Sequence, residues 1–266
     1  MKLRIVEPRQ GVVWVKSAIR AFLKQPIGFA AVFATGLFVV MILSLVPIAG
    51  TAVLLVMPPV GTLVFMIASR WAVAGKSPMP GAITELLGAG RQTWIELLKM
   101  GLLYAALTMA AGLLASVVDG GAFQALRDAL SAKEPTPETI GPLLANPRLQ
   151  LSILLFLTLS TLVSIPYWHA PALVHWGKLR WSKALFFSAV AVWRNKSAFT
   201  VYGLAWMGLM LALSSLVGVV AAVLGAPQVA AFVMMPLTLA LTTVFYASLW
   251  FTFDDSFTTT PEDPAP

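Results

Sequence analysis

The chain carries two histidines, His169 and His175, within the stretch YWHAPALVHWGK. Histidine is the side chain best suited to proton transfer near neutral pH and to binding transition metals. Six residues at about 100° each place the two imidazoles about 240° apart around a helix. Zinc-binding helices space histidines at i and i+4, and no Cys, Asp or Glu lies nearby in the sequence to complete a site. The sequence therefore predicts no metal site and no cofactor.

His169 is the stronger candidate for a functional residue, because it lies roughly 9 Å deeper in its apolar segment than His175. An ionisable side chain at such depth in a membrane is a functional hypothesis by default. Pro166 and Pro171 flank it, and with Tyr167 they mark a bent backbone with freed carbonyl groups. Two interpretations stay open: these four residues form a functional site, or a neutral histidine hydrogen-bonds a kinked helix. We favour the second.

Catalysis by a nucleophile needs a general base and a residue that orients this base. Ser160 and Ser164 share the apolar segment of His169, but no carboxylate lies inside any apolar segment to orient the imidazole. Proton-coupled transporters also carry Asp or Glu within their spans as a rule. We therefore expect no enzyme activity, and the composition disfavours proton-coupled transport.

The elements that must position these residues are transmembrane helices. Hydrophobic residues make up 59% of the chain and charged residues 11%, whereas a soluble domain has about 25% charged residues. A spanning helix needs about 20 apolar residues. Six segments reach this length, at about 27–46, 51–72, 97–118, 151–173, 198–224 and 228–252. The sequence predicts an all-α integral membrane protein with six transmembrane helices and no cleavable signal peptide.

The distribution of charge predicts the orientation. Fifteen of the eighteen Lys and Arg residues fall before the first span or in the segments 70–99 and 178–196, and three fall in 119–149. The positive-inside rule then places both termini in the cytoplasm and the 119–149 loop in the periplasm of a bacterial inner membrane. No basic segment is long enough for a nucleic-acid-binding domain. The acidic, proline-rich tail 254–266 is expected to be disordered.

Three similar units follow one another along the chain. Each is a basic amphipathic segment followed by two spans, and the segments at 10–24, 79–93 and 181–195 are predicted as interfacial helices. Gly75-Lys76 recurs as Gly177-Lys178, 102 residues later. Parallel repeats of this kind predict a pseudo-threefold arrangement about an axis along the membrane normal.

Two stretches carry a resemblance to a known family: the start MKLRIVEPRQGVVWVKSAIRAFLKQP and the run PYWHAPALVHWGKLRWSKALFFSAVAVWRNKSAFTVYG. Together they resemble an uncharacterised six-span inner-membrane protein family of proteobacteria, which is distantly similar to the membrane domain of some glycerophosphodiester phosphodiesterases. The resemblance covers nearly the whole chain. It implies a fold and a location, without an assigned activity or catalytic residues. The phosphodiesterase catalytic domain has no counterpart in this sequence.

Basic side chains and tryptophans gather at the predicted cytoplasmic ends of the spans. Seven of the nine tryptophans lie there, which is typical of an aromatic belt. Basic residues on the amphipathic segments would meet anionic lipid headgroups. The predicted headgroup contacts are Lys16, Arg20, Lys24, Arg91, Lys183, Arg194 and Lys196. We expect a non-enzymatic lipid-interacting or accessory membrane protein. The alternative is a transporter or exporter of a small apolar or lipid-like substrate, and the sequence names no protein partner.

Overall fold

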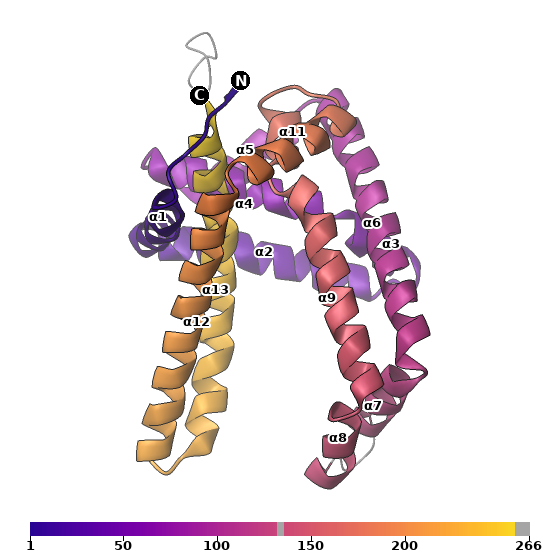
Figure 1. Ribbon diagram of the computed structural model, residues 1–266. Helices are drawn as coiled ribbons and strands as arrows, with labels where there is room; N and C mark the ends of the chain where they lie inside the picture. The colour runs from indigo at the N-terminus through magenta and orange to yellow at the C-terminus, as the bar shows by residue number, and fades with distance from the viewer. Residues whose placement is uncertain (132–135, 259–266) are drawn as a thin grey trace.

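The computed structural model describes residues 1–131 and 136–258, and this part of the chain is almost entirely helical. Two long helical hairpins lie apart from each other, and we call them the two legs (Figure 1). One consists of α6 (Arg91–Asp119) and α9 (Pro147–Tyr167), and the other of α12 (Lys196–Val223) and α13 (Pro227–Ser256). Large apolar side chains such as Leu113, Leu154 and Leu216 are exposed along both legs. Such a surface suits helices that face lipid instead of water.

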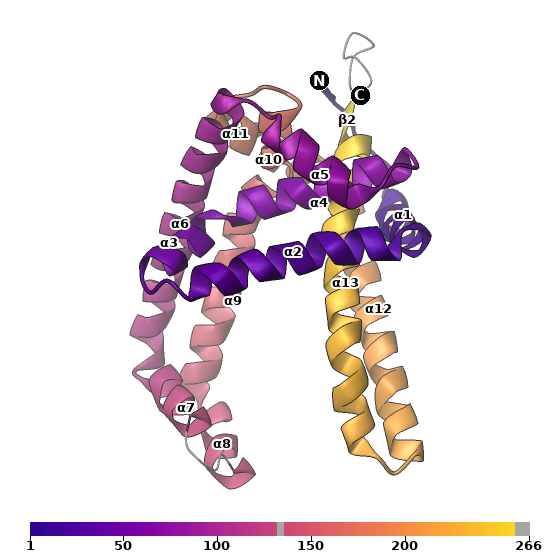
Figure 2. The ribbon, with the colours of Figure 1, turned by 180° about the vertical axis from the view of Figure 1, so that it is seen from behind.

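The remaining helices join the two legs at one end of the molecule. α2 (Pro26–Ser44) runs across from α13 toward α6, as Figure 2 shows. α3 (Ala49–Val56) packs on α6, and α4 (Pro58–Val73) returns to pack on α13. Within α4, Leu63, Met66 and Ile67 are fully buried. The hydrophobic core therefore lies around α4, where the legs are joined.

The apolar segment 51–72 is not one continuous helix. It breaks at Met57, and α3 and α4 meet at a bend of 50°. Pro58 and Pro59 explain the break, because proline has no backbone N–H to donate and its ring crowds the preceding turn. Among the described residues, five helices are long and apolar enough to cross a membrane, or up to six if the bent pair counts as one span.

The segment 151–173 is interrupted as well. α9 ends at Tyr167, and α10 (Ala170–His175) begins after Trp168 and His169. Pro166 lies in the last turn of α9 and Pro171 in the first turn of α10. Proline is tolerated in a first helical turn, where its missing N–H has no helical partner to lose. The short break therefore places the backbone of His169 between two helices.

Three amphipathic helices lie at the end of the molecule where the legs are joined, which we call the joined end: α1 (Gln10–Lys24), α5 (Pro78–Leu87) and α11 (Trp181–Arg194). The first and third match the predicted segments, but the predicted helix 79–93 is divided. α5 ends at Leu87, and α6 starts at Arg91 after Gly90, whose φ of 81° lies in the left-handed region that glycine adopts without a Cβ clash. The pseudo-threefold arrangement is not confirmed, because α2 crosses the legs whereas α6 and α12 run along them (Figures 1 and 2).

The beginning and the end of the described chain are tied together. β1 (Lys2–Leu3) pairs with the antiparallel strand β2 (Phe257–Thr258). The Asn195 side chain accepts a hydrogen bond from the Val6 N–H (2.9 Å) and donates one to the Arg4 carbonyl (3.0 Å). The expected disorder of the tail 254–266 is therefore wrong for its first five residues. Residues 259–266 lie outside the described part of the chain.

The far end of the α6–α9 leg carries two short helices, α7 (Ala122–Leu130) and α8 (Pro137–Leu144), within the predicted 119–149 loop. The Asp119 carboxylate accepts hydrogen bonds from the backbone N–H groups of Gly121 (2.6 Å) and Phe123 (3.3 Å) and so fixes the start of α7. Leu126 and Leu149 are buried between α7 and α9. This end of the molecule is thus a small folded cap on the leg.

Candidate functional site

A largely buried carboxylate at the joined end accepts hydrogen bonds from four donors, two on α4 and two at the end of α10. Oε1 of Glu85 on α5 accepts hydrogen bonds from Nε2 of His175 (3.0 Å) and the indole N–H of Trp176 (2.8 Å). Its Oε2 accepts from the indole N–H of Trp71 (2.8 Å) and a guanidinium nitrogen of Arg70 (3.2 Å). The Arg70 guanidinium also lies 5.0 Å from the centroid of the Trp176 ring. We call these five residues the Glu85 cluster.

The environment of Glu85 stabilises its ionised form. Burial by itself would raise the pKa of this carboxyl group. Hydrogen bonds from His175, Trp71 and Trp176 and the positive charge of Arg70 outweigh burial, and together they lower the pKa of Glu85 to about 2. The carboxylate is therefore charged at every physiological pH. Its chemistry is that of a fixed acceptor that holds α5 against α4 and α10, because a group with so low a pKa is a poor general base.

The Glu85 cluster corrects the sequence-based view of His175. No acidic residue lies near His175 in the sequence, but its side chain is buried and is paired with a carboxylate 90 positions earlier. Distance along the sequence hid this partner. One signal was available: Arg70-Trp71 and His175-Trp176 each lie near the end of an apolar segment, and hydrogen-bond donors such as these need an acceptor when they are buried.

Two further carboxylates at the joined end serve helix packing in the same way. Oε2 of Glu96 accepts a hydrogen bond from the Trp181 backbone N–H (2.9 Å) at the start of α11, where the helix dipole favours a negative charge. Oδ2 of Asp255 accepts from Gln10 (2.6 Å) and from the indole N–H of Trp14 (2.7 Å), which anchors α1 to α13. Trp14, like Trp71 and Trp176, therefore directs its indole N–H inward to a carboxylate, and not to lipid headgroups as an aromatic belt would.

His169 is fully buried in a shell of aromatic rings. The Phe199, Phe253 and Phe257 ring centroids lie 5.5–5.9 Å from that of its imidazole. Its Nε2 lies 3.1 Å from Oγ1 of Thr252, and this hydroxyl donates to the Leu249 carbonyl (2.8 Å). Because the Thr252 proton is used in that bond, Nε2 carries the imidazole proton and donates it to Thr252. The backbone N–H of His169 donates to Oγ of Ser188 (2.9 Å).

The three residues predicted together with His169 have backbone roles. Pro166 and Pro171 bound the break between α9 and α10. The hydroxyl of Tyr167 donates to the Met100 carbonyl on α6 (3.2 Å), across the leg. His169 lines neither of the two cavities described below. The geometry of these four residues joins α9, α10, α11 and α13 and shows no opening through which a substrate would reach the imidazole.

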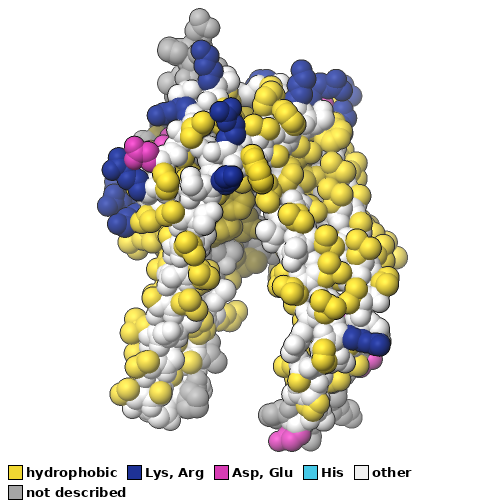
Figure 3. All heavy atoms as spheres, in the orientation of Figure 1, with side chains coloured by type: hydrophobic (Ala, Val, Ile, Leu, Met, Phe, Trp, Pro, Cys, Tyr) yellow, Lys and Arg dark blue, Asp and Glu magenta, His cyan; other side chains and the backbone are white. Residues whose placement is uncertain are grey.

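The seven basic residues predicted to contact headgroups are all exposed, and they lie on α1, α11 and the first turns of α6 and α12. Figure 3 shows Lys and Arg side chains gathered at the joined end of the molecule. In the described part of the chain, none of the seven lies within 4 Å of a carboxylate oxygen. Their charge is therefore available to an external anion.

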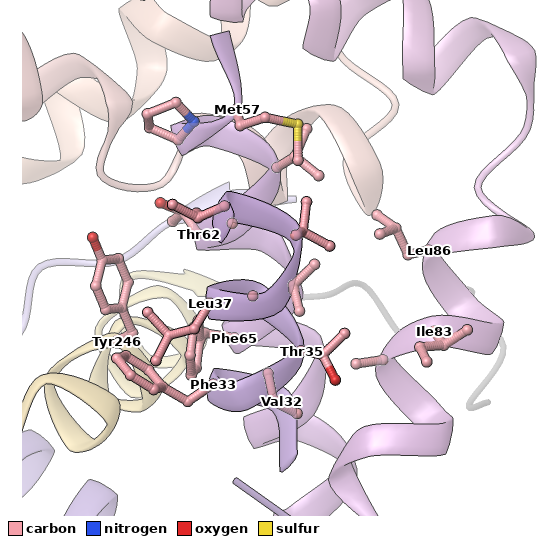
Figure 4. Close-up of a pocket in the computed structure, with 18 of the residues that line it drawn as sticks. Val32, Phe33, Thr35, Leu37, Met57, Thr62, Phe65, Ile83, Leu86 and Tyr246 are labelled. Atoms are coloured by element: carbon pink, nitrogen blue, oxygen red, sulfur yellow. The ribbon is translucent and has the colours of Figure 1, made fainter. Parts of the chain in front are cut away.

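Two cavities lie beneath the amphipathic helices. The first, of about 460 Å³, is bounded by α2, α4 and α5, with Tyr246 of α13 at one side (Figure 4). The second, of about 770 Å³, lies between α9 and α12 under α11. Lys196 and Trp193 both line this second cavity, and the Lys196 ammonium lies 5.1 Å from the centroid of the Trp193 ring. Sequence reasoning missed both cavities, because each depends on how several helices pack against one another, and the apolar lining residues have no distinctive spacing in the sequence.

Metal ligands are not grouped in the described residues: no three His, Asp or Glu side chains there could hold a metal ion together, and the chain has no cysteine.

Comparison with known proteins gives a location and no activity. The chain is similar to a probable inner membrane protein of Burkholderia thailandensis, with 35% identity over 258 residues that cover 97% of this chain and 94% of that protein. No family model matches the chain. No solved structure matches it either.

Proposed function

The chain belongs to the family of this probable inner membrane protein, and on that premise we propose that it is a non-enzymatic protein that binds anionic lipid headgroups through the basic residues of its joined end. The family and the five to six apolar helices make it a multi-pass inner-membrane protein. The proposal concerns what it does there.

One observation carries the proposal: in the described chain none of the seven predicted headgroup contacts lies within 4 Å of a carboxylate oxygen, whereas three carboxylates at the joined end bond to groups inside the fold. Glu85, Glu96 and Asp255 accept hydrogen bonds from tryptophans, from the start of α11 and from other donors inside the fold. None of these three carboxylates neutralises the charge of the seven exposed basic residues. Each basic group near an anionic leaflet contributes about 1 kcal/mol, so the attraction is distributed over the surface and weakened by salt.

Lys196 supports the same proposal at a single position. It lines the cavity under α11 together with Trp193, Phe186 and Phe199. A cation at the mouth of an apolar cavity suits an amphiphile that carries a negative headgroup and an apolar chain. Free inorganic phosphate would gain nothing from the apolar lining.

Replacing Lys16, Arg20 and Lys24 by glutamine tests the proposal. The purified triple variant should retain at least twofold less phosphatidylglycerol per protein than the parent protein, and the difference should shrink as salt rises. Arg127→Gln with Arg148→Gln, at the far end of the α6–α9 leg, is the matched control and should leave retention unchanged. His169→Ala should also retain the parental amount, because the imidazole is sealed from lipid. If the triple variant retained as much phosphatidylglycerol as the parent protein and His169→Ala retained less, the proposal would be wrong.

The orientation is part of the proposal. We place both termini and the basic end in the cytoplasm and the 119–149 segment in the periplasm, because the basic residues are so unevenly divided between the two ends. The absence of cysteine permits a clean test with single-cysteine variants. A membrane-impermeant maleimide should label Ser131→Cys in spheroplasts, and should label Ser182→Cys only after the membrane is opened. The opposite pattern would invert the topology.

A transporter or exporter of a small apolar or lipid-like substrate is the second candidate function. The apolar cavity under α5 favours it, because its lining offers few hydrogen-bonding groups. Vesicles with and without the protein separate the candidates: a transporter would speed the movement of a fluorescent lipid between leaflets, and a lipid-binding protein would not. The resemblance to the membrane domain of glycerophosphodiester phosphodiesterases also remains a proposal. A solved structure of such a domain with a helix order different from this one would contradict it.

A further inference from the structure

The cavity under α5 is a groove formed mainly by three helices. α2 contributes Val32 and Phe33, α4 contributes Gly61 and Phe65, and α5 contributes Ile83 and Leu86. Its volume of about 460 Å³ lies within the range of roughly 300–1,000 Å³ typical of small-molecule sites. In Figure 4, Phe33, Phe65 and Tyr246 lie on one side of the groove, and Ile83 and Leu86 lie on the other. The Phe65 and Tyr246 rings stack with their centroids 5.2 Å apart and form a rigid wall.

The lining restricts the chemistry of an occupant. Thr35, Thr62 and Tyr246 supply its hydroxyl groups, and the other lining side chains are apolar or glycine. The Thr35 hydroxyl is 4.0 Å from the sulfur of Met79 on α5, which also lines the groove. With so few polar groups to satisfy, an unbranched hydrocarbon chain gains about 0.8 kcal/mol for each methylene that it buries. A sugar, a nucleotide or a peptide would leave its hydrogen bonds unmade.

Two lysines lie in the sequence just before the helices that form the end of the groove at Val32 and Met79: Lys24 ends α1, and Lys76 lies two residues before the start of α5. The start of α2 meets the start of α5 there, since Gly28 lies directly against the Pro78 ring. Lys24 precedes this contact on the α2 side and Lys76 precedes it on the α5 side, and both are exposed. The Lys76 ammonium lies 5.1 Å from the centroid of the Trp71 ring. A cationic end next to an apolar groove is complementary to an anionic lipid.

Glu85 fixes α5, which forms one wall of the groove, to neighbouring helices. Ile83 and Leu86 line the groove, and Glu85 lies between them on another face of the same helix. This carboxylate is bonded to Trp71, His175 and Trp176, so α5 is fixed to α4 and to the end of α10. A fixed wall is preorganised for its ligand and needs no ordering when the ligand binds.

We infer that the groove between α2, α4 and α5 holds one acyl chain of an anionic phospholipid, with the headgroup against Lys24 and Lys76. This inference rests on the proposed lipid-binding function and assigns it a defined site. It distinguishes one bound lipid from the many that the exposed basic residues attract, because the bound lipid has its own shaped cavity.

Two glycines that line the groove allow it to be filled. A Cβ atom added at Gly61 on α4 or at Gly36 on α2 would meet no atom within 4 Å, so Gly61→Leu and Gly36→Leu start a side chain in open space beside the groove. Gly203→Leu on α12 is the matched control, because Gly203 is equally free of neighbours and does not line the groove. The two test variants lie on different helices, so a folding defect in one leaves the other informative.

The experiment uses the full chain in bilayers of phosphatidylcholine with a trace of photoreactive phosphatidylglycerol that carries a diazirine in one acyl chain. Irradiation and peptide mapping should find adducts in the segments 32–40, 57–65 and 79–86. Gly61→Leu and Gly36→Leu should lower these adducts at least fivefold, and Gly203→Leu should not. Adducts at the cavity lined by Phe186 and Trp193 serve as an internal control and should stay constant. With Lys24→Gln and Lys76→Gln together, phosphatidylglycerol should label the groove no better than a photoreactive phosphatidylcholine.

The outcomes separate this inference from the proposed function. Groove adducts that persist in both filled variants overturn the inference. Equal labelling of the parent groove by phosphatidylcholine and phosphatidylglycerol overturns it as well, because the headgroup would then not be recognised. If the filled variants lose the groove adducts while total retained phosphatidylglycerol is unchanged, the inference and the proposed function both stand. If the parent protein shows no preference for anionic lipid anywhere, the proposed function fails and the inference fails with it.

Discussion

At the residue scale, Glu85 accepts hydrogen bonds from four side chains at the joined end. Glu85→Gln keeps the shape of the side chain but removes the charge and one acceptor oxygen, while the four donors remain. We expect a loss of about 2 kcal/mol in the free energy of unfolding, seen as a fall in Tm of roughly 5 °C by tryptophan fluorescence in detergent. Glu138→Gln on α8, an exposed acid at the other end, should change Tm by less than a degree or so.

The same carboxylate predicts how stability depends on pH. The fold lowers the pKa of Glu85 to about 2, whereas an unfolded glutamate has a pKa of about 4.3. A group whose pKa is lower in the folded state stabilises the fold fully at pH values above its unfolded-state pKa. This contribution is lost as the pH falls through its folded-state pKa. The Tm of the parent protein should therefore fall between about pH 5 and pH 2 more steeply than that of Glu85→Gln. Parallel curves for the two proteins would show that Glu85 isn't the titrating group.

The candidate site could be predicted from the sequence only where its residues are neighbours in the chain. The exposed basic residues follow from helical spacing on amphipathic segments, and the prolines around His169 follow from the rules of helix interruption. The pairing of Glu85 with Trp71 and Trp176 couples positions 14 and 91 residues apart. No periodicity connects such positions, because tertiary packing alone brings them together.

At the element scale, helix existence could be predicted better than helix continuity. Hydropathy identifies the apolar segments that become α2, α6, α12 and α13, since an apolar run long enough to cross a bilayer has few alternatives to a helix. It does not distinguish a straight span from the bent pair α3 and α4, because Pro58 and Pro59 leave the hydropathy high. The direction of α2 across the legs depends on packing with α4 and α5, and such packing has no signature in a single sequence.

The pairing of β1 with β2 is an element-scale contact that can be tested directly. Lys2 and Thr258 are register partners, and antiparallel partners have a Cα separation within the range that a disulfide spans. Lys2→Cys with Thr258→Cys should therefore form an intramolecular disulfide under mild oxidation, detected as a faster-migrating band that a reductant removes. Lys2→Cys with Thr136→Cys, at the opposite end, should form none. If the first pair stays reduced, the two ends are not joined as described.

At the scale of the whole molecule, the pairing of β1 with β2 limits the number of membrane crossings. Residues 2–3 and 257–258 are hydrogen-bonded partners, so they lie on the same side of the membrane and the chain crosses it an even number of times. α2 and the bent pair α3–α4 must then cross together or stay on one side together. In both cases α5 lies on the same side as the two ends. The orientation inferred from charge therefore does not depend on whether this first pair of helices spans the bilayer.

The contact of α1 with the second leg has a consequence for how the protein is made. A ribosome releases β1 and α1 long before α12 and α13, yet α1 packs on α12 and α13 and its Trp14 is bonded to Asp255. Until α12 and α13 have been synthesised, α1 lacks the helices on which it packs in the finished protein. Its amphipathic character allows it to lie at the membrane surface during this time. Its docking, and the closing of β1 on β2, can follow only after the final hairpin has been inserted. Assembly is therefore completed by the two ends of the chain meeting each other, and a chain that stalls within α13 would lack the Trp14–Asp255 bond and the pairing of β1 with β2.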